Sequence, residues 1–427
     1  MTTTLEQAAR TGRLRWSGGC IFLLVGWSVT ILGMTFLARM GYVHSPWHAI
    51  ADMWLRNDIR VWDWAISLPV ISIVVALNAR NVRESWTLVA ATVLLVFAVA
   101  FLYTLGRPTI VDVYVAAKAG GLFGLFALAL QIRTRGGLER LLTVIVFSTF
   151  IPLSLIALDK TSTVRALTLD QYVYAFDEAL SFNPAQHLFV LFENNHWFNI
   201  SSTIIYDLIL PPTLILYAIQ TRWQDPTAAS AILVFIVASV AGFICYVAFP
   251  VSGPLYFFGA GRYAAHPATF PFPQGIDFKA SWRNAMPSLH FGLTLLMALN
   301  VPRQLRITRA AFFTFAVIIA IAALGKGEHY FTDMIAALPF VCAIQYLCRW
   351  IVDARANRLL TGFIRSAAVF ISFLIFLVVI PPGFYKPGVV WILTTMIAAI
   401  FMYELRNLAR NNRGLTCTES ALPNDSR

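Results

Sequence analysis

The sequence predicts an all-α, polytopic integral membrane helical bundle of about twelve transmembrane helices. Three observations predict this fold class. Hydrophobic residues make up 58% of the chain and charged residues only 12%, a balance that soluble domains do not show. Apolar runs long enough to cross a bilayer recur along the chain. The basic residues gather at the ends of these runs, as they do in multi-span membrane proteins.

The predicted spans follow one another with short connections and no intervening soluble domain. The first run follows Arg10, Arg13 and Arg15, as the apolar part of a signal peptide would. Its length and the lack of a small-residue cleavage site after it predict a retained first span instead. The full set of predicted spans is 18–38, 61–78, 86–105, 110–132, 138–158, 198–219, 228–249, 287–302, 308–325, 330–351, 360–381 and 388–404.

The distribution of arginine predicts the orientation of these spans. If the N-terminus faces the cytoplasm, most of the arginines fall in the short inner segments, so both termini are expected to be cytoplasmic. The net charge of +11 then reflects topology, and no nucleic-acid partner is expected. The five cysteines show no ligand spacing, which argues against a zinc site or a disulfide framework.

Two histidine-containing stretches, 284–292 and 327–333, are the strongest candidates for chemistry. His290 follows Pro287 and Ser288, which suit the first turn of a helix, where backbone N–H groups favour an anion. Asp333 lies four residues after His329, so on a helix the two would share one face. Asp333 could then accept a hydrogen bond from one ring nitrogen of His329 and leave the other free to attack.

These two stretches resemble the signature of the type 2 phosphatidic acid phosphatase superfamily. They are most similar to its inositol phosphorylceramide synthase-like branch, in which a Pro-Ser-Leu-His element precedes a His-Tyr-x-x-Asp element. The stretch 246–254, which contains Pro250 and Pro254, is similar to a proline-rich segment of that branch. The resemblance covers roughly residues 165–350. It says little about residues 1–160 or the tail. Together with the predicted spans, it gives an N-terminal bundle of about five helices at 1–160, a catalytic membrane domain at 161–352, and two helices with a polar cytoplasmic tail at 353–427.

The resemblance also implies catalytic roles. In that family the second histidine attacks phosphorus, the aspartate orients it, and the first histidine protonates the leaving oxygen. In this sequence those roles fall on His329, Asp333 and His290. Histidine needs no large pKa shift for either role. The phosphatase branch carries further cations that hold phosphate, but Ala100 and Ala323 stand where its lysine and second arginine would be.

Nearby polar residues are the expected substitutes for those cations. Ser288, Arg283 and Lys326 are the candidate phosphate-binding residues, because the chain holds them close to the histidines. No metal and no cofactor are expected, since the stretches lack the carboxylate-rich oxygen set that magnesium prefers. The arginine bias places the active site on the extracytoplasmic face.

The expected function is a lipid phosphotransferase that moves a phosphoinositol-like head-group phosphate to a lipid hydroxyl through a phosphohistidine. The alternative is a lipid phosphate or polyprenyl phosphate phosphatase of the same superfamily. A distant alternative is a twelve-span transporter, which Lys118 and Asp207 within spans would suit, although no two halves share a pattern. The expected partners are membrane lipids: a phospholipid donor and a lipid or water acceptor.

The segment 159–197 is aromatic-rich and amphipathic. Thr168 and Gln171 read as a capping box that opens a short helix there. Helices of this kind tend to lie in the membrane interface. The segment is expected to be either a gate for lipid or a cap over the outer end of the bundle.

Overall fold

The computed structural model describes residues 32, 35, 154, 156–162, 164–165, 167–207, 209–223, 225, 228–265, 276–277, 282–352 and 357–419. The chain divides into two compact units, Met1–Leu153 and Ser154–Arg427, and the described residues lie almost wholly in the second. The first five predicted spans, with Ala100 and Lys118, therefore fall mostly or wholly outside the described residues. The count of twelve spans and the predicted domain borders stay predictions.

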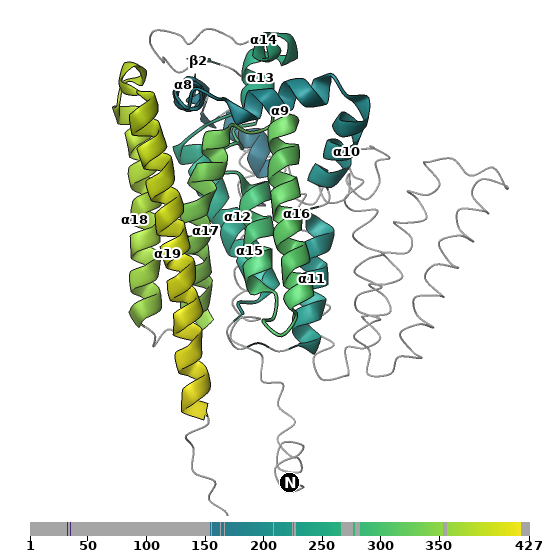
Figure 1. Cartoon of the computed structure of the whole chain (residues 1–427), viewed down its shortest axis with the longest axis vertical. Coiled ribbons are helices and arrows are strands. Elements are labelled where there is room, and N and C mark those ends of the chain that lie inside the picture. The colour runs from purple at the N-terminus through teal and green to yellow at the C-terminus, as the bar shows by residue number, and fades with distance from the viewer. Residues whose placement is uncertain are drawn as a thin grey trace, which may run out of the picture. The chain divides into compact units, whose positions relative to one another are not determined.

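Five helices of the second unit are long and apolar enough to cross a membrane, and they run alongside one another in Figure 1. They mark the chain as an integral membrane protein. Their outer faces carry exposed apolar side chains such as Ile371 (52% exposed) and Ile392 (68% exposed), which lipid accepts and water does not. These helices correspond to the spans predicted at 228–249, 308–325, 330–351, 360–381 and 388–404. They are α12 (Ala231–Ala248), α16 (Arg306–Gly325), α17 (Phe331–Val352), α18 (Asn357–Val379) and the first part of α19 (Pro387–Glu419).

Two predicted spans form shorter helices. The run predicted at 198–219 is split into α10 (His196–Asp207) and α11 (Leu210–Arg222). Pro211 and Pro212 explain the break, because proline cannot continue the hydrogen-bond ladder of a preceding helix but suits the first turn of a new one. The run predicted at 287–302 forms α15 (Leu289–Asn300). Its 12 residues rise only about 18 Å, and Pro302 prevents its continuation.

Short elements gather at one end of the bundle (Figure 1). A two-residue strand, β1 (Leu167–Thr168), pairs antiparallel with β2 (Ile276–Asp277). The aromatic-rich segment forms two helices, and Figure 1 shows α9 crossing the bundle end. The helices at this end are α8 (Asp170–Glu178), α9 (Pro184–Glu193), α13 (Pro254–Phe258) and α14 (Ala260–Ala264).

The predicted capping box is wrong. Helix α8 starts at Asp170, its N-cap residue is Leu169, and no side chain caps it. Thr168 belongs to β1, and its hydroxyl contacts the carboxylate of Asp170 and the carbonyl of Pro250. Pairing with β2 fixes the backbone of Thr168 in an extended strand. Its hydroxyl therefore contacts Asp170 and Pro250 and does not cap the helix.

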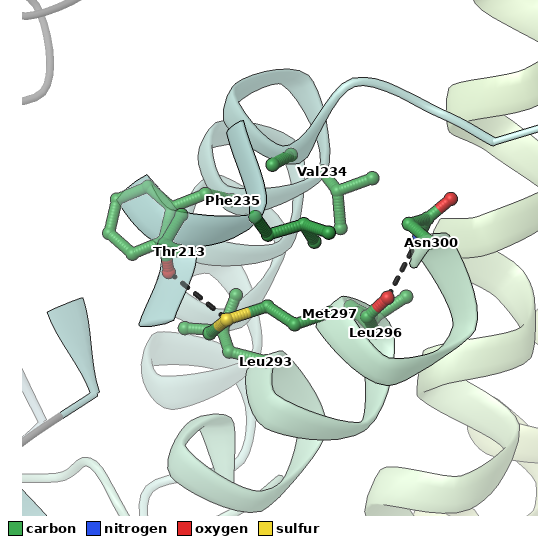
Figure 2. Close-up of a pocket in the computed structure, with 9 residues that line it drawn as sticks. Thr213, Val234, Phe235, Leu293, Leu296, Met297 and Asn300 are labelled. Atoms are coloured by element: carbon green, nitrogen blue, oxygen red, sulfur yellow. Dashed lines mark hydrogen bonds between the residues drawn. The ribbon is translucent and has the colours of Figure 1, made fainter. Parts of the chain in front are cut away.

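One side of α15 packs against α11 and α12 (Figure 2). Apolar side chains of the three helices meet there, and the hydroxyl of Thr213 lies 3.3 Å from the sulfur of Met297. At the end of α15, Asn300 and Gln345 of α17 exchange amide hydrogen bonds of 2.6 and 2.9 Å. The two helices that begin near the histidines are therefore locked together at their far ends.

Helix α17 is held from its other side by α18 and α19. The ring of Tyr346 lies where a side chain at Gly362 would be, 2.5 Å from the position of a Cβ atom. The hydroxyl of Tyr346 donates to the buried carboxylate of Glu404 at 2.8 Å, and Arg365 donates to the same carboxylate at 2.6 Å. Paired charges satisfy one another inside a bundle where lone charges would be costly.

Candidate active site

His290 lies in the first turn of α15, as the sequence predicts. Ser288 is the N-cap residue, and Gly292 donates the first intrahelical hydrogen bond to the Ser288 carbonyl at 2.9 Å. The backbone N–H groups of residues 289–291 have no acceptor within their own helix. They make the start of α15 a place where negative charge is favoured.

His329 lies two residues before the start of α17 and beside His290, with their ring centroids 6.2 Å apart. Its Nδ1 atom lies 2.9 Å from the carbonyl oxygen of Ala285. A carbonyl can only accept, so Nδ1 carries the hydrogen and Nε2 keeps its lone pair. Burial lowers the pKa of His329 to about 4, which differs from the expected unshifted value. The ring is therefore neutral at pH 7, the form that a nucleophile needs.

Asp333 contacts His329 but does not provide its shortest hydrogen bond. The Oδ2 atom of Asp333 lies 3.4 Å from Nδ1 of His329. The two residues do not share a helix face as expected, because α17 begins at Phe331 and His329 lies before it. The same oxygen accepts a 2.7 Å hydrogen bond from the backbone N–H of Tyr330. A carboxylate at the start of a helix is drawn to free backbone N–H groups, so the carbonyl of Ala285 becomes the closer acceptor for the imidazole. Asp333 remains a carboxyl group beside the ring.

Tyr206 of α10 links the two histidines. Its ring stacks on the ring of His290, with centroids 3.8 Å apart and planes 18° apart. Its hydroxyl lies 3.3 Å from Nε2 of His329. Since that nitrogen is unprotonated, the hydroxyl donates and Nε2 accepts. The tyrosine therefore covers the nitrogen that would attack.

Lys326 lies beside this group. Its ammonium is 4.7 Å from the centroid of the Tyr206 ring, a distance at which a cation is attracted to the face of an aromatic ring. The structure thus brings Lys326 to the site that the sequence predicts. Phosphate binding by Lys326 stays a prediction.

The other two predicted phosphate-binding residues are fully buried. The guanidinium of Arg283 donates to the Ser252 hydroxyl at 2.9 Å and to the Arg165 carbonyl at 3.2 Å. These bonds fasten the loop that follows α12. The backbone N–H of Ser288 donates to the carbonyl of Asp333 at 3.3 Å, which ties the start of α15 to the first turn of α17. Phosphate binding by Arg283 and Ser288 stays a prediction.

Two buried carboxylates of α8 hold the segments that carry the site. Asp177 accepts hydrogen bonds from the N–H groups of Phe331 and Thr332, at 2.8 and 2.9 Å. It thereby caps α17 from a different helix. Asp170 accepts bonds from the N–H groups of Ser252 and Gly253, both at 2.9 Å. Burial raises the pKa of Asp177 to about 7, so its charged form depends on these donors.

The loop after α12 packs directly on the segment before His329. Gly253 has φ = 95°, and a Cβ atom there would lie 2.2 Å from the carbonyl oxygen of Glu328. The N–H of Leu255 donates to the carbonyl of Gly327 at 2.9 Å. Only glycine allows both the backbone conformation and the close approach. This contact connects the proline-rich stretch at 246–254 to the second histidine.

Sequence reasoning missed Tyr206, Asp177 and the carbonyl of Ala285. Tyr206 falls within the run that was predicted as a continuous span, where an aromatic residue is unremarkable. Asp177 is an acidic residue of an amphipathic segment, and its distance in sequence from α17 hides its role. The one available signal was the pair of prolines after Tyr206, which shows that the predicted span is interrupted.

The described residues contain no group of three or more histidine, cysteine or acidic side chains that could hold a metal ion. Metal independence stays a prediction. The arrangement instead brings together an unprotonated imidazole nitrogen, a second imidazole and a tyrosine hydroxyl, with an ammonium group on the face of the tyrosine ring. These are the groups that a phosphoryl transfer needs: a nucleophile, a proton donor and positive charge for the phosphate.

Comparison with known proteins agrees with this chemistry. Searches of curated proteins and of solved structures found no match to the chain. A family model described as the PAP2 superfamily matches residues 171–347, which run from α8 into α17 and include both histidines, Asp333 and Tyr206. The match supports an enzyme with a lipid phosphatase-like or phosphotransferase-like function.

Proposed function

We propose that the protein is a membrane-embedded lipid phosphotransferase that works through a phosphohistidine on His329. It moves a phosphoinositol-like head-group phosphate from a phospholipid to a lipid hydroxyl. The observation that carries the proposal is the state of His329. Its Nδ1–H is held by the Ala285 carbonyl, and its lone pair on Nε2 faces the Tyr206 hydroxyl.

In the first step, Nε2 of His329 attacks the phosphorus of the donor. A nitrogen–phosphorus bond forms, and the bond from phosphorus to the diacylglycerol oxygen breaks. His290 must enter this step as the imidazolium; it donates a proton to that oxygen and becomes neutral. The imidazole retains its Nδ1–H and becomes positively charged, and the carboxylate of Asp333 at 3.4 Å stabilises that charge.

In the second step, the acceptor hydroxyl attacks the phosphohistidine. His290 takes the proton of the hydroxyl, a new oxygen–phosphorus bond forms, and the nitrogen–phosphorus bond breaks. His290 and His329 then return to their starting protonation states. The overall reaction exchanges one phosphodiester for another.

Tyr206 and Lys326 are proposed to hold the phosphate in place of the missing cations. Nε2 cannot attack while the Tyr206 hydroxyl occupies it, so substrate binding must displace that hydroxyl. A phosphate centred about 3 Å from Nε2 would bring its free oxygens within reach of the displaced hydroxyl. Lys326, on the face of the same ring, would neutralise the added negative charge.

Transfer to lipid, rather than to water, is supported by the burial of the site. His329 is 1% exposed and Tyr206 is 7% exposed, and the apolar Phe291 follows His290 in α15. Exclusion of water protects a reactive intermediate from hydrolysis. If water were the acceptor, the same residues would make a lipid phosphate or polyprenyl phosphate phosphatase.

The test is to trap the intermediate and identify the acceptor. Purified protein is reconstituted with phosphatidylinositol labelled with ³²P, with and without a lipid alcohol. Label should appear on His329 and move to the lipid alcohol. His329→Ala should abolish both signals, whereas His187→Ala should not. His187 is a suitable control because its Nδ1 also contacts a backbone carbonyl, that of Asn183, at 2.8 Å.

Two results would contradict the proposal. Turnover by folded His329→Ala protein would exclude the phosphohistidine. Release of free inositol phosphate at the same rate with and without lipid alcohol would show that the enzyme is a hydrolase.

A further inference from the structure

A second polar site lies at the end of the bundle opposite the histidines. A cavity of about 310 Å³ is lined there by residues of four helices and of two loops, one before α12 and one before α16. Helix α17 connects the two sites, with Asp333 in its first turn and Arg349 in its last turn. At a rise of about 1.5 Å per residue, these residues lie roughly 24 Å apart. The cavity is therefore separate from the proposed active site.

Three arginines from different parts of the chain line this cavity. Arg303 follows α15, Arg309 lies in α16, and Arg349 lies in α17. Asp225 is the acidic residue among the described residues of the lining, and its carboxylate accepts a 3.0 Å bond from the backbone N–H of Arg303. The lining thus carries more positive than negative charge. Like charges gathered in a partly enclosed space repel one another, and a bound anion would relieve that repulsion.

The arginines are also held in place for recognition. Arg303 and Arg349 contact the carbonyls of Ala409 and Leu408 at 3.5 and 3.4 Å. The guanidinium of Arg309 lies 6.0 Å from the centroid of the Phe313 ring. Guanidinium groups present fixed donors that match the oxygens of a phosphate.

The rest of the lining favours a lipid as the source of that phosphate. Phe313, Leu405 and Leu408 line the cavity together with the arginines. Ile307, which precedes Arg309 by two residues, is 88% exposed. An exposed isoleucine at the end of a spanning helix is expected to face lipid. A volume of about 310 Å³ lies in the range of small-ligand sites and accommodates a glycerophosphate head group.

We propose that this cavity binds the phosphate group of an anionic phospholipid, with Arg303, Arg309 and Arg349 as its ligands. The lipid would sit in the leaflet opposite the histidines, with its glycerol against Phe313 and its acyl chains along the outer faces of α16 and α19. Binding there would brace α15, α16, α17 and α19 at one point. This site does not depend on the reaction at His329.

The test uses the full-length protein in a neutral detergent. Phosphatidylglycerol is titrated into the protein, and binding is followed by native mass spectrometry and by the shift in unfolding temperature. Phosphatidylcholine serves as the zwitterionic comparison and inorganic phosphate as the soluble one. Phosphatidylglycerol should bind and stabilise the protein more than either.

Substitutions locate the site. Arg309→Gln and Arg349→Gln should each weaken phosphatidylglycerol binding by about tenfold, because each removes a charge-assisted hydrogen bond. Arg306→Gln is the matched control. Arg306 begins the same helix and is exposed, but it does not line the cavity, so binding should be unchanged.

Three outcomes would overturn the proposal. If Arg306→Gln weakened phosphatidylglycerol binding as much as the other two substitutions, binding would depend only on the overall positive charge at this end of the bundle. If Arg309→Gln bound phosphatidylglycerol as tightly as the wild type, the proposed site would be wrong, even if Arg349→Gln failed to fold. Inorganic phosphate that binds as well as phosphatidylglycerol would rule out a lipid.

Discussion

The hydroxyl of Tyr206 lies 3.3 Å from Nε2 of His329, the nitrogen that the neighbouring carbonyl leaves unprotonated. In the site without substrate, the nucleophilic nitrogen therefore already accepts a hydrogen bond from the Tyr206 hydroxyl. A substrate phosphate must take the place of that hydroxyl, and the hydroxyl then becomes available to the phosphate. One residue thus connects substrate entry with phosphate binding.

Tyr206→Phe should reduce kcat by about 10- to 100-fold, because a hydrogen bond to the transferring phosphate is lost. The ring stack on His290 and the contact with Lys326 should persist, since phenylalanine keeps the ring. Tyr256→Phe is the control. Its hydroxyl donates to Glu328 at 3.0 Å, beside the nucleophile in sequence, and its removal should leave kcat unchanged. A faster Tyr206→Phe enzyme would show that the hydroxyl only blocks Nε2.

His290→Ala should impair substrates with an alkoxide leaving group by on the order of 10²- to 10⁴-fold, because the proton donor is lost. A nitrophenyl ester needs no proton on its leaving group and should be affected much less. Phosphoenzyme formation from both substrates measures the difference. Equal losses on both would indicate that His290 holds the phosphate instead of donating a proton.

Phosphoenzyme formation from the nitrophenyl ester should change little from pH 7 to pH 5 and should fall near pH 4. The reason is that burial lowers the pKa of His329 to about 4, so the attacking nitrogen stays unprotonated until then. A fall centred near pH 6.5 would mean that the site is open to water in solution.

The same pKa predicts the pH dependence of stability. The unfolded chain takes up a proton on this histidine near pH 6.5, whereas the folded protein does so only near pH 4. Stability contributed by neutral His329 is therefore complete above about pH 6.5 and is lost as the pH falls toward 4. His329→Gln should reduce this loss in thermal unfolding measured across the range.

Asp177→Asn should lower the stability by about 0.5–2 kcal/mol, the usual cost of losing a helix cap. It should also lower kcat, because the cap positions the start of α17 next to His329. Glu178→Gln is the control in the same helix, since Glu178 accepts a bond from Asn183 instead. A variant with lower unfolding temperature but normal kcat would show that the cap only stabilises α17.

An impermeant thiol reagent should label Ala264→Cys, but not Gln304→Cys, in intact cells. Ala264 ends α14 beside the helices over the site, and Gln304 lies between α15 and α16 at the opposite end of the bundle (Figure 1). The arginine bias places the first end outside the cytoplasm. The unsubstituted protein provides the background signal, and labelling of position 304 alone would reverse the topology.

Sequence alone determined the class of this protein and the position of its histidines. Composition and the length of apolar runs predict membrane helices because the bilayer sets the length of a spanning helix. Five of the runs in the second unit are such helices. The sequence predicts that His290 and His329 lie close together because each stands at the end of an apolar run. It also predicts their chemistry, because that follows from the imidazole side chain itself.

Tertiary structure decided which groups surround those histidines. Tyr206 lies 123 positions from His329, and Asp177 lies 154 positions from Phe331, so no local pattern joins them. The hydrogen bond from His329 to Ala285, closer than its contact with Asp333, likewise depends on how two chain segments pack. Periodicity reports which face of a helix is buried. Hydrogen bonds between distant segments are fixed only when those faces meet.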